Sequence, residues 1–236
     1  MTSLTSQYVG TLGWASARTY AIVEGTIDVG LLTRASDLHL QKFGRPIIDE
    51  DFAIVAAGRG DDGGVDGVNR GLITLRQIMD ADRDERGALR YRVLGLYDND
   101  YNGRAGFGLV SRMDQRILPY VDIFLLKPVM PAVGDGISDR QIETTIANQA
   151  FPQLDWEIED LCSERLLQKF EANFPAFVMS KTEVNGKIHR EIEREGKVEL
   201  LRLFEAEATF DDAVEMIRLM KLLRGYLGVQ YDHIRC

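Results

Sequence analysis

The chain has 236 residues, 45% hydrophobic and 28% charged, which is enough to bury a sizeable core. No apolar run approaches the roughly 20 residues that cross a bilayer, and the first residues lack the basic start and apolar core of a secretory signal. Cys162 and Cys236 are too few for a four-ligand zinc site, and the position of Cys236 argues against a structural disulfide. We therefore expect a cytoplasmic protein that does not bind a membrane.

The charge balance excludes fewer classes of protein than the composition does. The chain carries 37 acidic and 28 basic residues, for a formal net charge of −9. Indiscriminate nucleic-acid binding relies on clustered Lys and Arg, so this balance argues against it. It does not exclude an enzyme that acts on nucleic acid, because acids that hold metal ions are neutralised in the loaded site.

Up to about residue 133, short apolar runs alternate with helical stretches. Near-continuous apolar strands are typical of a parallel sheet covered by helices on both faces, and tandem strand–helix units predict a compact α/β fold. The predicted strands are 19–23, 52–57, 91–97 and 121–126, and the predicted helices are 26–44, 66–81 and 105–116.

The Pro- and Gly-containing segment 127–139 has the composition of a boundary, and the chain beyond it is mainly helical. We expect an N-terminal extension (1–17), a catalytic α/β domain (18–133) and a helical subdomain (134–236). Asn185-Gly186 between extended segments predicts a β-hairpin within 177–193. The helices expected in this part are 138–149, 156–172, 197–208 and 211–227. The last carries more apolar surface than one face needs, which slightly favours a homodimer or partner interface over core packing.

Acidic residues follow two of the predicted strands. Glu24 comes directly after the first strand, and Asp28 follows one helical turn later. In "VLGLYDNDYNGRAG" (93–106), Asp98 and Asp100 follow the third strand and would point the same way if that strand continued. Ligands of open α/β sheets collect at the carboxyl ends of strands. Four carboxylates converging there predict a site for Mg²⁺ or Mn²⁺, which could act on a phosphate.

Plainer interpretations of these acids stay open. They could be solvated loop residues or helix caps, and Asp28 could complement a helix dipole. The segment "DNDYNG" also begins like a calcium-binding EF-hand loop. However, the twelfth position is Leu109 instead of Glu, and a strand precedes the loop instead of a helix.

The glycine-rich segment "GRGDDG" (58–63) matches a dinucleotide-binding fingerprint, but its two acids would repel a pyrophosphate and it follows the second strand. We interpret it as a loop at the same rim of the sheet. Arg59, Arg70 and Arg104 are then candidates to contact a phosphate backbone. The chain has no P-loop motif, so we expect no ATP binding of that kind.

Glu24 in "VEG" after the first strand, together with "YDNDYNGRAG" after the third, resembles the TOPRIM domain over residues 18–133. That resemblance implies a Mg²⁺-dependent phosphoryl-transfer site. Glu24 would be a metal ligand or general acid/base, and Asp98 and Asp100 would be metal ligands. Asp28 completes an E-x-x-x-D pattern that is similar to the overcoming-lysogenization-defect (OLD) type of nuclease.

Two later segments, "WEIEDL" (156–161) and "EGKVELLRLF" (195–204), also resemble OLD-type segments. By this resemblance Glu159 would be a ligand of a second Mg²⁺ or Mn²⁺ ion, and Lys197 would stabilise charge on the phosphate. The alternatives are that the acids around Glu159 merely open a helix and that Lys197 is a solvated helical residue.

Within the family, the chain lacks the additional domains of topoisomerases and the zinc modules of primases. We therefore expect a metal-dependent nuclease acting on DNA, working with a separately encoded ATPase in a bacterial anti-phage defence complex. An RNA-processing nuclease similar to the ribosomal-RNA maturation enzyme is the first alternative. A catalytically silent module that binds nucleic acid or a partner protein is the second.

Overall fold

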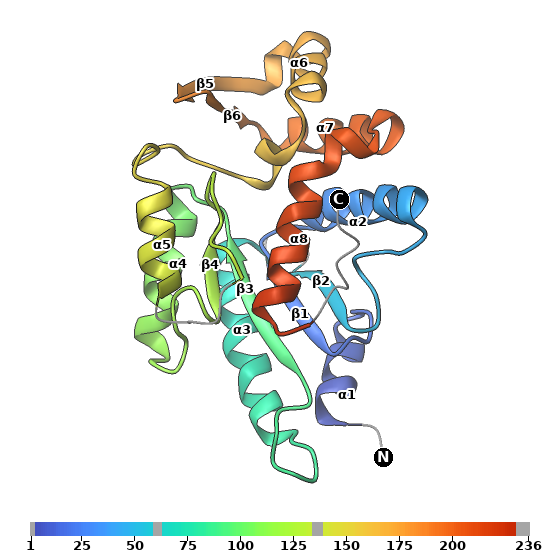
Figure 1. The fold of residues 1–236 in the computed structure, drawn as a ribbon, viewed down its shortest axis with the longest axis vertical. Helices are drawn as coiled ribbons and strands as arrows, with labels where there is room; N and C mark the ends of the chain where they lie inside the picture. Colours follow the sequence, from blue (N-terminus) through green and yellow to red (C-terminus); the bar gives the residue numbers. More distant parts are fainter. Residues whose placement is uncertain (1–2, 59–62, 134–138, 230–236) are drawn as a thin grey trace.

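A computed structural model describes residues 3–58, 63–133 and 139–229. Its centre is a four-stranded parallel sheet with the order β2-β1-β3-β4 (Figure 1). The strands are β1 (Thr19–Val23), β2 (Phe52–Ala56), β3 (Arg92–Tyr97) and β4 (Ile123–Leu125). This confirms the predicted α/β class and all four predicted strands. Because the strands are parallel, all their carboxyl ends meet at one edge of the sheet.

Helices cover both faces of the sheet, and alternate strand residues point to each face. Ala21 and Val23 face the cluster packed by α2 and α6–α8, while Tyr20 and Ile22 face α1, α3 and α4. The first cluster joins residues from both sides of residue 134 in one core. The helices are α1 (Leu4–Thr11), α2 (Thr26–Phe43), α3 (Gly64–Ala81), α4 (Tyr101–Met113), α5 (Arg140–Ala147), α6 (Glu164–Asn173), α7 (Arg194–Glu207) and α8 (Val214–Tyr226).

The predicted hairpin is present as β5 (Val178–Val184) and β6 (Lys187–Ile192), which pair antiparallel. Asn185 and Gly186 both have positive φ, 49° and 77°, as a tight two-residue turn requires. In Figure 1 the hairpin lies with α6 and α7 beyond the carboxyl-end edge of the sheet. No helix in the described ranges is both long enough and apolar enough to span a bilayer.

Two predicted helices differ most from the structure at their starts. The helix expected from 105 begins at Tyr101, because Asp100 caps it by accepting the Gly103 N–H at 2.6 Å. A continued strand, the condition under which Asp98 and Asp100 would point the same way, is therefore not met, since β3 ends at Tyr97. The helix expected over 156–172 is a 3₁₀ turn (Ile158–Leu161) followed by α6, separated where extended Cys162 precedes the N-cap Ser163.

The apolar residues of α8 pack against the core. This contradicts the preference for an interface on helix 211–227, because these side chains already have partners within the chain. Tyr226 stacks on Phe124 of the sheet, with ring centroids 4.4 Å apart. The buried members are Met216, Ile217, Leu219, Met220 and Leu223.

Candidate active site

Glu24 and Asp98 meet at the carboxyl ends of the two central strands. Parallel pairing of β1 with β3 places both residues directly after their strands at one edge. The Glu24 Oε1 atom accepts the backbone N–H of Asp98 at 3.1 Å. The proximity that the sequence predicts for these two acids is thus present.

Asp28 lies in the first turn of α2, at 7% exposure. Its Oδ2 accepts the Gly25 N–H at 2.8 Å, so it caps the helix as the plainer interpretation proposed. The capping role does not remove Asp28 from the site, because the carboxylate of Glu159 acts on its pKa. Asp28 therefore serves the helix and lies among the acids at once.

Residues 157 and 159 bring two further carboxylates from the second half of the chain. Lys197 on α7 places its Nζ 2.9 Å from Glu157 Oε2 and 3.2 Å from Glu159 Oε1. Lys197 is thus not a solvated helical residue: its side chain is 23% exposed and forms an ion pair with both acids. Sequence reasoning assigned Glu157 only to a helix start, although it belongs to the same acidic run as Glu159.

Asp100 and Arg70 lie on a neighbouring cleft of about 580 Å³. Glu24 lines the same cleft, together with Gly63, Gly64 and residues of α4. The cleft opens between the starts of α3 and α4, which both point their N-termini toward the strand ends. Such N-termini favour negatively charged groups, but Glu24, Asp66 and Asp100 also line the cleft, so a phosphate there would need a cation beside it.

Burial and mutual repulsion raise the pKa of the clustered acids. Loss of solvent is the main cause, and neighbouring carboxylates add to it: the pKa rises to about 7 for Glu24, Asp28 and Glu157. The same two causes hold the pKa of Asp98 well above its usual range. Burial opposes the charge of Lys197, but the carboxylates of Glu159 and Glu157 outweigh it and raise the pKa of that ammonium group.

The donor set suits a hard divalent cation by its chemistry. All candidate ligands are carboxylate oxygens, which Mg²⁺ and Mn²⁺ prefer. Neither carboxylate oxygen of the buried Glu159 accepts a hydrogen bond from a described residue, although Lys197 Nζ forms an ion pair with Oε1 at 3.2 Å. Yet among the described residues no three His, Cys, Asp or Glu side chains are arranged to hold a metal ion as they stand. The oxygens fit the ion, while binding requires the side chains to turn toward a common centre.

The three predicted phosphate-contacting arginines have different surroundings. Arg70 is exposed at the cleft. Arg104 donates from Nη1 to the Asn99 carbonyl at 2.8 Å and to Asp155 Oδ1 at 2.6 Å, so it already holds two groups of the protein. Arg59 lies outside the described residues.

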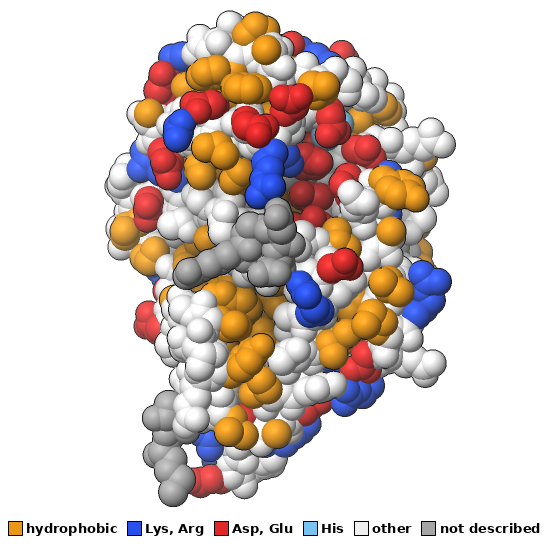
Figure 2. Space-filling model, turned by 180° about the vertical axis from the view of Figure 1, so that it is seen from behind, with side chains coloured by type: hydrophobic (Ala, Val, Ile, Leu, Met, Phe, Trp, Pro, Cys, Tyr) orange, Lys and Arg blue, Asp and Glu red, His pale blue; other side chains and the backbone are white. Residues whose placement is uncertain are grey.

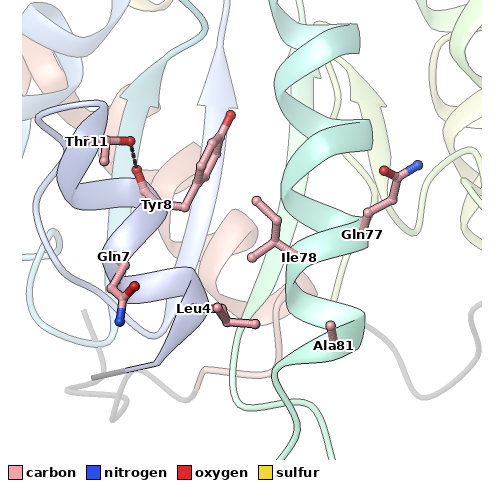
Figure 3. Close-up of a pocket in the computed structure, with 7 residues that line it drawn as sticks. All are labelled: Leu4, Gln7, Tyr8, Thr11, Gln77, Ile78 and Ala81. Atoms are coloured by element: carbon pink, nitrogen blue, oxygen red, sulfur yellow. Dashed lines mark hydrogen bonds between the residues drawn. The ribbon is translucent and has the colours of Figure 1, made fainter. Parts of the chain in front are cut away.

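A second hollow, of about 540 Å³, lies between α1 and α3 (Figure 3). Leu4, Tyr8, Ile78 and Ala81 give it apolar walls without an ionisable acid or base near neutral pH. It borders the C-terminal end of α3, about 20 Å along the helix from the end that meets Glu24, at 1.5 Å per residue. This hollow is therefore separate from the carboxylates.

The surface does not carry a continuous basic stripe on the face seen in Figure 2, where Lys and Arg side chains lie scattered among acidic ones. Extended electrostatic contact with a phosphate backbone would need such clustering on some face.

In comparisons with known proteins, no family model, no curated protein and no solved structure matches the chain. The residues at the strand ends are accordingly the basis for a functional conclusion.

Proposed function

We propose that this chain is a divalent-metal-dependent nuclease that hydrolyses phosphodiester bonds of DNA, with a TOPRIM-like catalytic domain of the OLD type. The observation that carries the proposal is the contact of Glu24 with the Asp98 backbone at 3.1 Å, surrounded by the buried acids Asp28 and Glu159. The helix cap accounts for Asp28 and the ion pair with Lys197 accounts for Glu159, but neither explains why Glu24 and Asp98 lie beside these acids. A site that exchanges protons for cations does.

Glu24, Asp28, Asp98 and Glu159 would hold one or two Mg²⁺ or Mn²⁺ ions, with Asp100 at the adjoining cleft. The ions would supply charge stabilisation at the phosphate and an activated water. Glu24 would act in this reaction either as a metal ligand or as a general acid/base. Lys197 would hold Glu157 and Glu159 in place and contribute positive charge near the phosphate.

The test is cleavage of plasmid, single-stranded DNA and RNA, each with Mg²⁺, Mn²⁺ or chelator. We expect DNA cleavage that needs the metal and disappears in Asp98→Asn. Asp114→Asn is the matched control, because Asp114 pairs with Arg116 away from the strand ends. DNA left intact under all conditions contradicts the proposal, and cleavage of structured RNA alone identifies the RNA-processing alternative.

One observation favours the catalytically silent module as the second candidate. Lys197 already pairs with two of the acids, and no described trio of ligands is preformed. A silent module predicts nucleic-acid or protein binding without cleavage in Mn²⁺, with no change in Asp98→Asn. The metal titration in the same experiment separates it from the nuclease.

We also propose that a separately encoded ATPase joins the chain in an anti-phage defence complex, because the OLD-type nucleases that the chain resembles usually work with an ATPase domain. Size-exclusion chromatography of the chain mixed with candidate ATPases tests this partner. Co-elution at a fixed stoichiometry supports the complex, and separate elution of every candidate contradicts it.

A further inference from the structure

The acids of the candidate site come from segments more than fifty residues apart in the sequence. Asp98 and Asp100 lie in the loop after β3, whereas Glu157 and Glu159 lie beyond α5. The two segments meet at Asn99 and Trp156, whose backbones exchange two hydrogen bonds. Asn99 N–H donates to the Trp156 carbonyl at 2.9 Å, and Trp156 N–H donates to the Asn99 carbonyl at 3.3 Å. The same double exchange joins a hydrogen-bonded pair in an antiparallel sheet.

The side chain of Asn99 adds two more links, and it is only 2% exposed. Its Nδ2 donates to the Leu154 carbonyl at 2.8 Å, and its Oδ1 accepts from Lys127 Nζ at 2.7 Å. A lysine can only donate and a carbonyl can only accept, so these partners fix which end of the amide is which. Lys127 follows β4, so Asn99 connects three separate stretches of chain.

Every polar group of Asn99 thus has a partner inside the protein. Arg104 completes the arrangement, because it donates to the Asn99 carbonyl at 2.8 Å and to Asp155 at 2.6 Å. Fully satisfied buried polar networks fix one arrangement of the groups they join. The residue between the two aspartates therefore has a structural task different from theirs.

We propose that Asn99, held by Lys127, is a positioning residue that keeps the segment bearing Asp98 in register with the segment bearing Glu157 and Glu159. Aspartate could still accept from Lys127 but could not donate to Leu154. Alanine would leave both the Leu154 carbonyl and the Lys127 ammonium without this partner. The consequence for metal binding rests on the proposed function, whereas the register itself does not.

Hydrogen exchange of the metal-free protein, followed by mass spectrometry, tests the register directly. In Asn99→Ala we expect amides of 154–161 to exchange at least about ten-fold faster, the factor that corresponds to losing a buried polar link of about 1.4 kcal/mol. Ser36→Ala is the matched control, because buried Ser36 also ties distant backbone by accepting the Ile47 and Ile48 N–H groups. Equal exchange of 154–161 in the two variants overturns the proposal.

Lys127 provides a second, independent pair of variants. Lys127→Met should accelerate exchange in 154–161, and Lys127→Arg should restore it, because arginine can still donate to Asn99 Oδ1. If Asn99→Ala does not fold, this pair decides alone: acceleration with rescue supports the proposal, and unchanged exchange overturns it.

Mn²⁺ titration by calorimetry then measures the effect on the candidate site. Asn99→Ala should weaken Mn²⁺ binding at least about ten-fold, while Ser36→Ala leaves it near the wild-type value. Wild-type protein that neither binds Mn²⁺ nor cleaves contradicts the proposed function but leaves the exchange result to decide the role of Asn99. Unchanged Mn²⁺ affinity in Asn99→Ala, with a wild type that binds, overturns the positioning role.

Discussion

Asp98 illustrates how a single residue can oppose the stability of the fold. Its half-buried side chain lies beside Asp28 and Glu24, and the loss of solvent together with these carboxylates keeps its pKa well above the usual range. Charging it in the metal-free protein is therefore unfavourable. A residue retained for its packing would stabilise the fold instead of opposing its stability.

Asp98→Asn consequently has two expected effects on thermal unfolding. The metal-free variant should be as stable as the wild type or more stable, because a repelling acid is gone. Mn²⁺ at about a hundred times its Kd should stabilise the wild type by about 2.7 kcal/mol and the variant much less. Asp114→Asn should keep the full Mn²⁺ effect. Equal Mn²⁺ stabilisation in wild type and Asp98→Asn would exclude Asp98 as a ligand.

Lys197→Met removes the cation that faces Glu157 and Glu159. At pH 8 we expect a loss of about 3 kcal/mol in the free energy of unfolding, because two buried acids lose their partner. The loss should shrink near pH 5, because burial raises the pKa of Glu157 to about 7 and this carboxyl is protonated there. Urea denaturation at both pH values measures this.

Lys169→Met provides the comparison for that variant, since Lys169 pairs with Glu207 at the surface and both side chains are about 40% exposed. It should cost less than about 1 kcal/mol at either pH. Similar losses in the two variants would mean that Lys197 acts as an ordinary surface residue.

At the scale of elements, the turn from β3 into α4 sets the position of the acids. A Cβ on Gly103 would lie 1.9 Å from the Asp98 carbonyl oxygen, so only glycine fits at this position without a shift of the backbone. Gly106 has a similar constraint, since its Cβ would lie 1.9 Å from Val65 Cγ1 on α3. These two glycines allow α4 to start tightly after the acids and to pack closely on α3.

Gly103→Ala should therefore destabilise the protein by more than about 1 kcal/mol and disturb the site, while Gly108→Ala on the same helix should not. The space beside Gly108 is open within 4 Å, so alanine there should stabilise α4 by about 0.5 to 1 kcal/mol. Chemical denaturation measures both variants. A stabilising Gly103→Ala would show that the turn can relax without cost.

At the scale of the whole molecule, the second half of the chain is joined by polar links to the buried Asp212 as well as by the apolar core. Asp212 accepts hydrogen bonds from Ser163 and from Arg165 Nε at 3.0 Å, together with the Thr209 N–H at 2.9 Å. It thereby joins the start of α6 to the turn before α8. Although burial works against it, these bonds hold the pKa of Asp212 well below its usual range.

The pH dependence follows from the sign of that shift. A depressed pKa means that Asp212 stabilises the folded state above the ordinary value near 3.8 and loses this contribution as the pH falls further. Asp212→Asn should lower the unfolding free energy by about 2 kcal/mol at pH 7, and the difference from wild type should narrow below pH 4. Urea titrations between pH 7 and pH 2 measure it. A difference in unfolding free energy between wild type and Asp212→Asn that stayed constant across that range would contradict the lowered pKa of Asp212.

The sequence by itself determined the α/β class, the four strands, the hairpin turn and the meeting of Glu24 with Asp98. These follow from local rules: apolar runs bury strands, Asn-Gly adopts positive φ, and parallel strands end at one edge. Tertiary structure decided the rest. The cap at Asp100, the pairing of Lys197 with Glu157 and the links of Asn99 depend on contacts between distant segments. The core packing of α8 has the same origin, because the burial of an apolar face depends on what the rest of the chain places beside it.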